Sequence, residues 1–481
     1  MSDTIGPFST AGEMLAALDA KEISSVELVE MHLARIEKLD EALNAIPVRT
    51  PERALEAARH ADELRAAGES RPLLGLPMTL KESTQVAGLP QSAGIVPFKD
   101  YRPEADGPIA RSVSSAGSCL LGKTNIPVAL ADWQADSPVY GRSNNPWDLE
   151  RTPGGSTGGG AAALAAGFTP LEIGSDIGGS IRVPAAYCGV YGHRPSETVL
   201  PRTGSFPLAD RPNPGVVMAV QGPLARSASD LELLFDVVAG PDQQESTAWR
   251  LDLPPARHEQ LSDFRVAIMP PLSLARPSSE MQGKVDELAT LLSRSGAKVG
   301  EAMPAVDHNT YLRDYMTLLV AITSQAQPRE EREASATDLD RTDPHQDGVA
   351  IGLTVDAAGY LATLNRRAAA QAAWSAFFDE WDVVVCPTAL DAAFTHRSGA
   401  QSTRAFDIDG RTVPYALNIV YPMWAIFTGQ PATAFPAGLS SSGLPLGLQA
   451  IGPYLEDRTT LRFARLLERE WHAFEAPPAF A

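Results

Sequence analysis

Cysteine is scarce in this chain, with Cys119, Cys188 and Cys386 as the only three among 481 residues. Their odd number and wide separation exclude a disulfide framework, and their spacing is not that of a metal site. We therefore expect three buried free thiols, as in a reducing cytoplasm. We also expect no metal ion and no organic cofactor.

Long uncharged apolar runs are missing, because no stretch approaches the roughly 18 residues from which a membrane-spanning helix is recognised. The first residues, Met1–Thr4, lack the basic and apolar regions of a signal peptide. Positive charge is in the minority, since 40 Lys and Arg residues against 59 Asp and Glu residues leave a net charge of −19. A chain this acidic has no general attraction to nucleic acid or to an anionic membrane, so we predict neither as a partner.

Short apolar runs alternate with helical stretches through most of the chain, which is typical of an α/β protein. The clearest predicted strands are Leu76–Leu80, Cys119–Leu121 and Leu171–Gly174, and the clearest predicted helices between them are 108–116 and 158–166. The sequence contains no internal repeat and no long linker rich in Pro, Gly or Ser. It therefore predicts one large α/β domain.

The beginning of the chain favours helix instead, and its Ser-Ser-Val-Glu sequence matches a capping box ahead of apolar residues at helical spacing. We predict an N-terminal helical arm over residues 1–70, packed on a single domain over residues 71–481. That domain is expected to have a helical elaboration over about 255–380. Inside the elaboration, the polar and charge-dense stretch 329–346 predicts a mobile surface loop.

Two glycine-rich stretches carry the candidate chemistry. Residues 153–160 read Pro-Gly-Gly-Ser-Thr-Gly-Gly-Gly and lead into an alanine-rich helix, so Ser156 lies near a helix N-terminus. Residues 174–182 read Gly-Ser-Asp-Ile-Gly-Gly-Ser-Ile-Arg and follow a predicted strand. Ser180 therefore lies past the carboxyl end of a strand, where open α/β sheets place their sites.

Other interpretations of these glycines fit less well. A phosphate-binding loop is excluded, because no Gly-Lys-Ser/Thr sequence follows either stretch. A nucleophile elbow is a closer match, since Gly154–Gly158 fits G-x-S-x-G between a strand and a helix. It would make Ser156 the nucleophile of a Ser-His-acid hydrolase and would need a histidine such as His396 or His472. Neither histidine lies in a suggestive sequence context.

Lys81 ends an apolar run that begins at Gly75. A lysine in that position is ordinarily a surface residue whose stem packs on apolar groups. It becomes a candidate base once two serines are available as partners, because burial lowers the pKa of a lysine. Only the neutral amine can then take a proton from a serine.

The sequence resembles the amidase signature family over most of its length. The resemblance is carried by Gly154–Gly159 with its Ser156, by Asp176–Ala185 with its Ser180, and by Lys81. It implies an α/β fold in which a large mixed β-sheet is flanked by helices on both faces, and it implies a homodimer. It also implies that Ser180 is the nucleophile, that Ser156 is a bridging serine held by a cis peptide bond, and that Lys81 is the base.

The second glycine-rich stretch also offers backbone N–H groups to the oxyanion that forms during acyl transfer. The expected donors are Ile177, Gly178, Gly179 and Ser180. Four further residues are expected to support the loops: Gly155, Thr157, Asp176 and Arg182. Thr157 and Glu82 depart from the family, in which many members have serine and aspartate at these positions.

The candidate substrate pocket is mainly aromatic. Its predicted residues are Trp133, Gln134, Tyr140, Tyr187, Phe206 and Leu208. No basic residue stands out as a partner for a substrate carboxylate, so an uncharged aryl or alkyl substrate is favoured.

The leading hypothesis is an enzyme that hydrolyses linear amides, with esters, anilides and carbamates as further options, through a Ser180 acyl-enzyme. Its partners would be a small-molecule amide and water. The alternative from the same family is the A subunit of a tRNA-dependent amidotransferase, which works only inside a complex.

Overall fold

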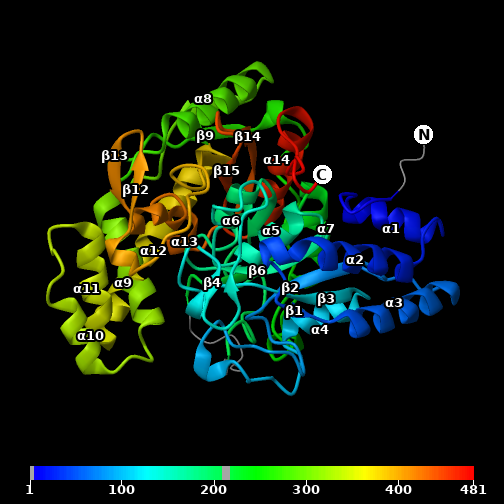
Figure 1. Cartoon of the computed structure of the whole chain (residues 1–481). Helices are drawn as coiled ribbons and strands as arrows, with labels where there is room; N and C mark the ends of the chain where they lie inside the picture. The colour runs from blue at the N-terminus through cyan, green and yellow to red at the C-terminus, as the bar shows by residue number, and fades with distance from the viewer. Residues whose placement is uncertain (1–4, 208–216) are drawn as a thin grey trace.

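The apolar runs pair into one mixed sheet of eleven strands in the computed structural model, which describes residues 5–207 and 217–481 (Figure 1). The strand order is β1-β3-β2-β6-β8-β7-β14-β15-β11-β9-β10. The strands are β1 Val48–Arg49, β2 Pro77–Lys81, β3 Cys119–Thr124, β6 Leu171–Asp176, β7 Tyr191–Arg194, β8 Val220–Ala225, β9 Arg265–Ile268, β10 Lys298–Glu301, β11 Val383–Pro387, β14 Ala432–Leu439 and β15 Pro445–Ile451.

Parallel pairing is confined to two groups, β3-β2-β6 and β11-β9-β10, and the other neighbours are antiparallel. Two small antiparallel pairs lie outside the main sheet: β4 Asp136–Ser137 with β5 Gly141–Arg142, and β12 Ala405–Ile408 with β13 Arg411–Pro414. The predicted mixed α/β architecture is therefore confirmed.

The helices are α1 Ala11–Asp19, α2 Ser25–Leu43, α3 Pro51–Ala66, α4 Pro108–Ser115, α5 Gly158–Ala165, α6 Arg182–Cys188, α7 Ala228–Val238, α8 Ser279–Arg294, α9 His308–Thr323, α10 Arg329–Ala336, α11 Pro344–Thr354, α12 Ala357–Glu380, α13 Met423–Thr428 and α14 Asp457–Glu470. None of these described helices combines the length and apolar character needed to cross a membrane. The three cysteines are buried and free, as predicted.

Strand β15 shows why helices cover both faces of the sheet. Its side chains alternate, and Leu448 and Ala450 join the apolar core that includes α8 and α14. Gln449, which lies between them, contacts Arg182 of α6 on the opposite face. Because both faces of this strand are buried, each must be covered by helices.

The first helices follow from local sequence. The Ser24 side chain accepts a hydrogen bond from Glu27 N–H, and the Glu27 carboxylate accepts one from Ser24 N–H, so the predicted capping box is confirmed. Figure 1 shows α1, α2 and α3 in blue on one side of the molecule. Val48 and Arg49, which follow α2, add an antiparallel edge strand to β3. This segment therefore contributes to the sheet as well as lying on it, and the division at residue 70 stays a prediction.

The prediction of a loop over 329–346 is wrong in most of its length, because α10 and the start of α11 occupy it. Arg329–Ala336 is made of good helix formers, and its first turn carries Glu330 and Glu331, which interact favourably with the helix dipole. The apolar periodicity that would have revealed this helix is missing, since none of its side chains is buried.

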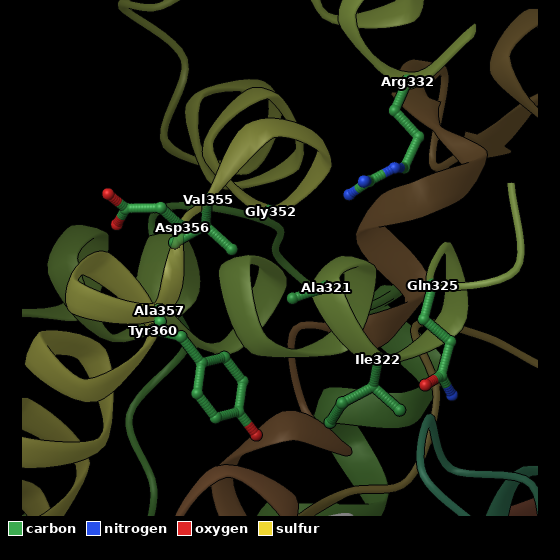
Figure 2. A pocket seen from close by; sticks show the side chains of 9 residues that line it. All are labelled: Ala321, Ile322, Gln325, Arg332, Gly352, Val355, Asp356, Ala357 and Tyr360. Atoms are coloured by element: carbon green, nitrogen blue, oxygen red, sulfur yellow. The ribbon is translucent and has the colours of Figure 1, made fainter. Parts of the chain in front are cut away.

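Helices α9, α10, α11 and α12 lie together at one end of the molecule, away from α1–α3 (Figure 1). They line an open pocket of about 320 Å³, shown in Figure 2, whose lining includes Ile322, Arg332 and Tyr360. None of the predicted site residues lines this cavity. The range 255–380 also includes strands β9 and β10 of the main sheet, with α8 between them, and α9–α12 follow. The helical elaboration as a separate part of the domain stays a prediction.

Candidate active site

Parallel pairing brings Lys81 to the loop that contains Ser180. Lys81 is the last residue of β2, and Asp176 is the last residue of its parallel neighbour β6. Parallel strands end at the same edge of a sheet, so the loop from Ile177 to Ser180 begins beside Lys81. The side chain of Lys81 is fully buried.

The amine of Lys81 contacts three hydroxyl groups. Its Nζ lies 2.7 Å from Ser156 Oγ, 3.0 Å from Thr157 Oγ1 and 2.9 Å from Ser175 Oγ. A neutral amine has two N–H donors and one lone pair, so it can satisfy three such partners if one hydroxyl donates to it. The sequence gives no sign of the Ser175 contact, because it joins residues 94 positions apart and depends on the pairing of β2 with β6.

Burial lowers the pKa of Lys81 to about 7, and the nearby carboxyl groups of Asp176 and Glu172 only partly oppose this effect. Removing a charged amine from water is costly, so the neutral form is favoured. A substantial fraction of Lys81 is therefore neutral near pH 7.

The cis peptide bond predicted by the resemblance is present between Gly155 and Ser156. Gly155 has no space for a side chain, since an added Cβ would lie 2.3 Å from the carbonyl oxygen of Asp132 and 2.8 Å from Gln134 N. Backbone contact on this scale leaves glycine as the residue that fits. Gly155 therefore supports the loop by allowing the segment around Gln134 to pack directly on it.

Asp176 braces the Ser180 loop from inside the protein. Its carboxylate accepts hydrogen bonds from Gly179 N–H at 2.9 Å, from Ile181 N–H at 3.3 Å and from Arg182 Nε at 3.0 Å. Burial would raise the pKa of Asp176, but the Arg182 guanidinium, with smaller contributions from Arg194 and the Gly179 N–H, lowers it overall. The predicted Asp176–Arg182 pair is confirmed, with both side chains fully buried.

One predicted oxyanion donor needs correction. Gly179 N–H already donates to Asp176 and is therefore occupied. In the described ranges, the N–H groups of Ile177, Gly178 and Ser180 make no hydrogen bond. These three N–H groups stay the predicted oxyanion donors.

Ser180, the predicted nucleophile, lies near Lys81 and Ser156, but the contacts of its hydroxyl show only part of the predicted relay. Ser180 is nearly buried, with an exposed fraction of 7%. The Lys81–Ser156 contact that a proton relay needs is present at 2.7 Å. In the part of the chain that is described, no hydrogen bond joins the hydroxyls of Ser156 and Ser180. The roles of the three residues stay predictions.

Two aromatic side chains hold the carbonyls of this loop through their polar groups. Trp133 Nε1 donates to Gly178 O at 3.0 Å, and the hydroxyl of Tyr315 donates to Ile177 O at 2.9 Å. Trp133 was predicted to line a substrate pocket, and Tyr315, on α9, was not predicted at all. No sequence signal marks Tyr315, because it is 138 residues from its partner.

Several predicted pocket residues have protein partners instead of free polar groups. The Gln134 side chain bonds to the backbone of Arg397 in both directions, at 2.9 and 2.7 Å. The hydroxyl of Tyr140 donates to Glu82 at 2.7 Å. These polar groups are not available to a substrate, which corrects the expectation for Gln134 and Tyr140.

The remaining pocket predictions are dispersed. Tyr187 is buried and lines a cavity of about 340 Å³ together with Phe394 and Phe406. Phe206 is half-buried, and Leu208 lies outside the described residues. The predicted substrate pocket is therefore not assembled as one unit, and it stays a prediction.

The alternative of a Ser-His-acid hydrolase lacks its histidine. Ser156 Oγ bonds to Lys81, and His472 instead lies 3.6 Å from Glu287. Both ring nitrogens of His396 are without a hydrogen-bond partner among the described residues. The described residues also include no group of three or more His, Cys, Asp or Glu side chains suited to hold a metal ion.

Comparison with known proteins agrees with this geometry. The family model described as Amidase matches residues 27–461. The chain therefore belongs to the amidase family, whose signature enzymes act on carbon–nitrogen bonds.

Curated relatives of this chain point to one activity within the family. The chain is 31% identical to the A subunit of glutamyl-tRNA(Gln) amidotransferase from Methylococcus capsulatus, over 96% of this chain and 97% of that protein. It is likewise 31% identical to the corresponding protein of Chromohalobacter salexigens, over 96% of this chain and 97% of that protein.

Solved structures similar to this chain include enzymes with other activities. A bacterial aryl acylamidase of the amidase signature family matches with a TM-score of 0.81 and 25% identity, over 97% of this chain and 96% of its own. A 6-aminohexanoate cyclic dimer hydrolase matches with a TM-score of 0.79 and 25% identity, over 99% of this chain and all of its own.

The substitution Asp176→Asn should lower the free energy of unfolding by about 3–5 kcal/mol, because it leaves the buried Arg182 charge without its partner. Urea denaturation followed by fluorescence measures this change. A matched control is Glu333→Gln, which breaks the exposed Arg329–Glu333 pair and should leave stability unchanged. Equal stability of Asp176→Asn and wild type would contradict the bracing role of Asp176.

Proposed function

We propose that this enzyme cleaves the C–N bond of a carboxamide through an acyl-enzyme on Ser180. The observation that carries the proposal is the buried Lys81 amine, 2.7 Å from Ser156 Oγ and beside the loop of Ser180. A serine hydroxyl becomes a good nucleophile only when a neighbouring base removes its proton. Lys81, with its pKa lowered to about 7 by burial, is such a base.

In the first half of the reaction, Ser180 Oγ attacks the amide carbonyl carbon and loses its proton to Ser156, which passes a proton to Lys81. The carbonyl oxygen becomes an oxyanion that accepts hydrogen bonds from the free N–H groups of the loop. The C–N bond then breaks as Lys81 returns the proton, through Ser156, to the departing nitrogen. The acyl group stays on Ser180 as an ester.

In the second half, water takes the place of the amine. It gives a proton along the same relay and attacks the ester carbonyl, and a second oxyanion forms in the same place. Collapse of that intermediate releases a carboxylic acid, and Ser180 regains its proton. The net reaction consumes one water molecule and yields an acid and an amine.

For the substrate we propose a small uncharged amide. The likeness to an aryl acylamidase supports this class. A charge pair next to the Ser156 loop also supports it, because Asp132 and Arg404 form an ion pair at 2.7 Å and largely neutralise each other. Neither charge is then free to select a charged substrate.

A second candidate is the role of the A subunit in an amidotransferase that acts on glutamyl-tRNA(Gln). The curated relatives support it better than they support a free amidase, because they match nearly the full length of both chains. In this role the same amide cleavage would occur inside a complex. The prediction that nucleic acid is no partner receives no support from relatives of this kind.

A substrate panel distinguishes the two candidates. The purified chain alone is assayed on anilides, alkyl amides and free glutamine, with liquid chromatography to follow the acid and the amine. A free amidase should turn over the anilides without any partner. Activity on glutamine alone, or activity that appears only with a partner protein purified from the source cells, would favour the role within an amidotransferase complex.

In either role, Ser180→Ala should reduce kcat by at least about 10³-fold, because it removes the atom that is acylated. The matched control is Ser293→Ala on α8, which removes an exposed serine hydroxyl far from Lys81 and should leave kcat unchanged. Full turnover by Ser180→Ala would refute the proposed acyl-enzyme.

The value of kcat/KM should rise with pH through about 7 and then level off, because Lys81 accepts a proton only after losing its own. At lower pH the protonated amine dominates, and kcat/KM should fall by about tenfold per pH unit. Lys81→Arg should be inactive at every pH, since a guanidinium stays charged. A profile that stays flat well below neutral pH would exclude Lys81 as the base.

A further inference from the structure

The hydroxyl of Tyr315 reaches the loop of residues 177–180, which carries the predicted oxyanion donors, from helix α9. Tyr315 lies in the middle of α9, is fully buried, and donates a hydrogen bond to Ile177 O at 2.9 Å. It is the sole hydrogen-bond partner of that carbonyl among the described residues. Helix α9 is held in turn by Asp314, which forms an ion pair with Arg366 of α12 at 2.6 Å.

This contact has a defined effect on the next residue. The C=O and N–H groups of one trans peptide point in opposite directions. Fixing the carbonyl of Ile177 against α9 therefore turns the N–H of Gly178 away from α9. That N–H is one of the free donors of the loop.

Side-chain packing does not fix the orientation of the Ile177–Gly178 peptide, in contrast to the hydrogen bond from Tyr315. Gly178 has no side chain, and an added Cβ would have ordinary contacts of 3.7 Å with Ile419 and 3.9 Å with Tyr315. Glycine can adopt many backbone conformations. Without the hydrogen bond, the Ile177–Gly178 peptide would be free to rotate and to carry its N–H with it.

The neighbouring peptides of the loop are secured by other groups. Gly178 O accepts from Trp133, and Gly179 N–H donates to Asp176, so both ends of that peptide are fixed. Gly179 O accepts from Val183 N–H at 2.8 Å, which orients the N–H of Ser180. The Gly178 donor is thus the one whose direction depends on Tyr315.

We propose that Tyr315 is a positioning residue that holds the Gly178 N–H toward the oxyanion of the Ser180 reaction. This proposal rests on the proposed function of Ser180. It gives the helical region α9–α12 a part in catalysis, because the position of α9 decides where the Tyr315 hydroxyl lies. A donor that is preorganised stabilises the transition state more than the bound substrate, so the effect falls on kcat.

The test compares Tyr315→Phe with Tyr311→Phe. Tyr311 lies one turn earlier on α9, is equally buried, and donates its hydroxyl to Trp424 O at 2.8 Å instead of to the loop. Both variants lose one buried phenol hydroxyl. We expect Tyr315→Phe to lower kcat by about 10- to 100-fold with little change in KM, somewhat less than the loss of a whole oxyanion donor. Tyr311→Phe should keep kcat near the wild-type value.

A spectroscopic measurement separates positioning from general loosening. The acyl-enzyme is trapped on Ser180 with an activated ester, and the stretching frequency of its carbonyl is recorded by isotope-edited infrared spectroscopy. Hydrogen bonds to the carbonyl oxygen lower this frequency. We expect a higher frequency in Tyr315→Phe than in wild type and an unchanged frequency in Tyr311→Phe.

Each outcome decides the proposal. Equal kcat and equal carbonyl frequency in Tyr315→Phe and Tyr311→Phe would overturn it, while the activity of the wild type would still support the Ser180 mechanism. A wild type that forms no acyl-enzyme would overturn both. If Tyr315→Phe does not fold, 3-fluorotyrosine at position 315 replaces it. That residue is a stronger donor, so the carbonyl frequency should fall, and an unchanged frequency would overturn the proposal.

Discussion

The structure depends on keeping one amine out of water. Lys81 ends an interior strand of the sheet, and its charge would be strongly stabilised by solvent if solvent could reach it. Helix α5 prevents this by packing on the sheet at backbone distance. An added Cβ on Gly159 would lie 2.3 Å from Asn125 N, and one on Gly160 would lie 2.7 Å from the side chain of Glu172. The glycines after Ser156 therefore let the helix close over Lys81.

The same burial explains the hydroxyl groups around Lys81. A polar atom inside a protein is costly unless it is hydrogen-bonded. Ser156, Thr157 and Ser175 satisfy the amine without adding charge, so they leave its pKa low. A carboxylate in direct contact would have raised that pKa and held the proton. The choice of hydroxyls is therefore part of what lets a lysine serve as a base.

The two functional candidates use the same Lys81, Ser156 and Ser180, and they differ in the substrate and in the need for a partner protein. Trp133 and Gln134, from the segment predicted to contact substrate, are tied to the loop at Gly178 and to the backbone at Arg397. Residues from widely separated parts of the chain thus hold these two side chains in place. This dependence on several segments is consistent with a family whose members share a fold but differ in substrate.

The local sequence determined a large part of this protein. The capping box at Ser24 follows from contacts between residues three positions apart, and the start of α3 follows from a proline in its first turn. The placement of Ser180 after a strand and its brace from Asp176 to Arg182 are also local, since six positions separate the two charged residues. Patterns of this length are visible in a sequence because the interacting groups lie on the same stretch of chain.

Only the tertiary structure decided which distant groups meet. It brought Ser175 to Lys81 across 94 residues and placed Tyr315 on Ile177 across 138 residues. It also made a helix of the stretch that begins at Arg329, which has no buried face to reveal it. Strand pairing and helix packing join segments that carry no mutual pattern in sequence, so these contacts appear only when the chain is folded.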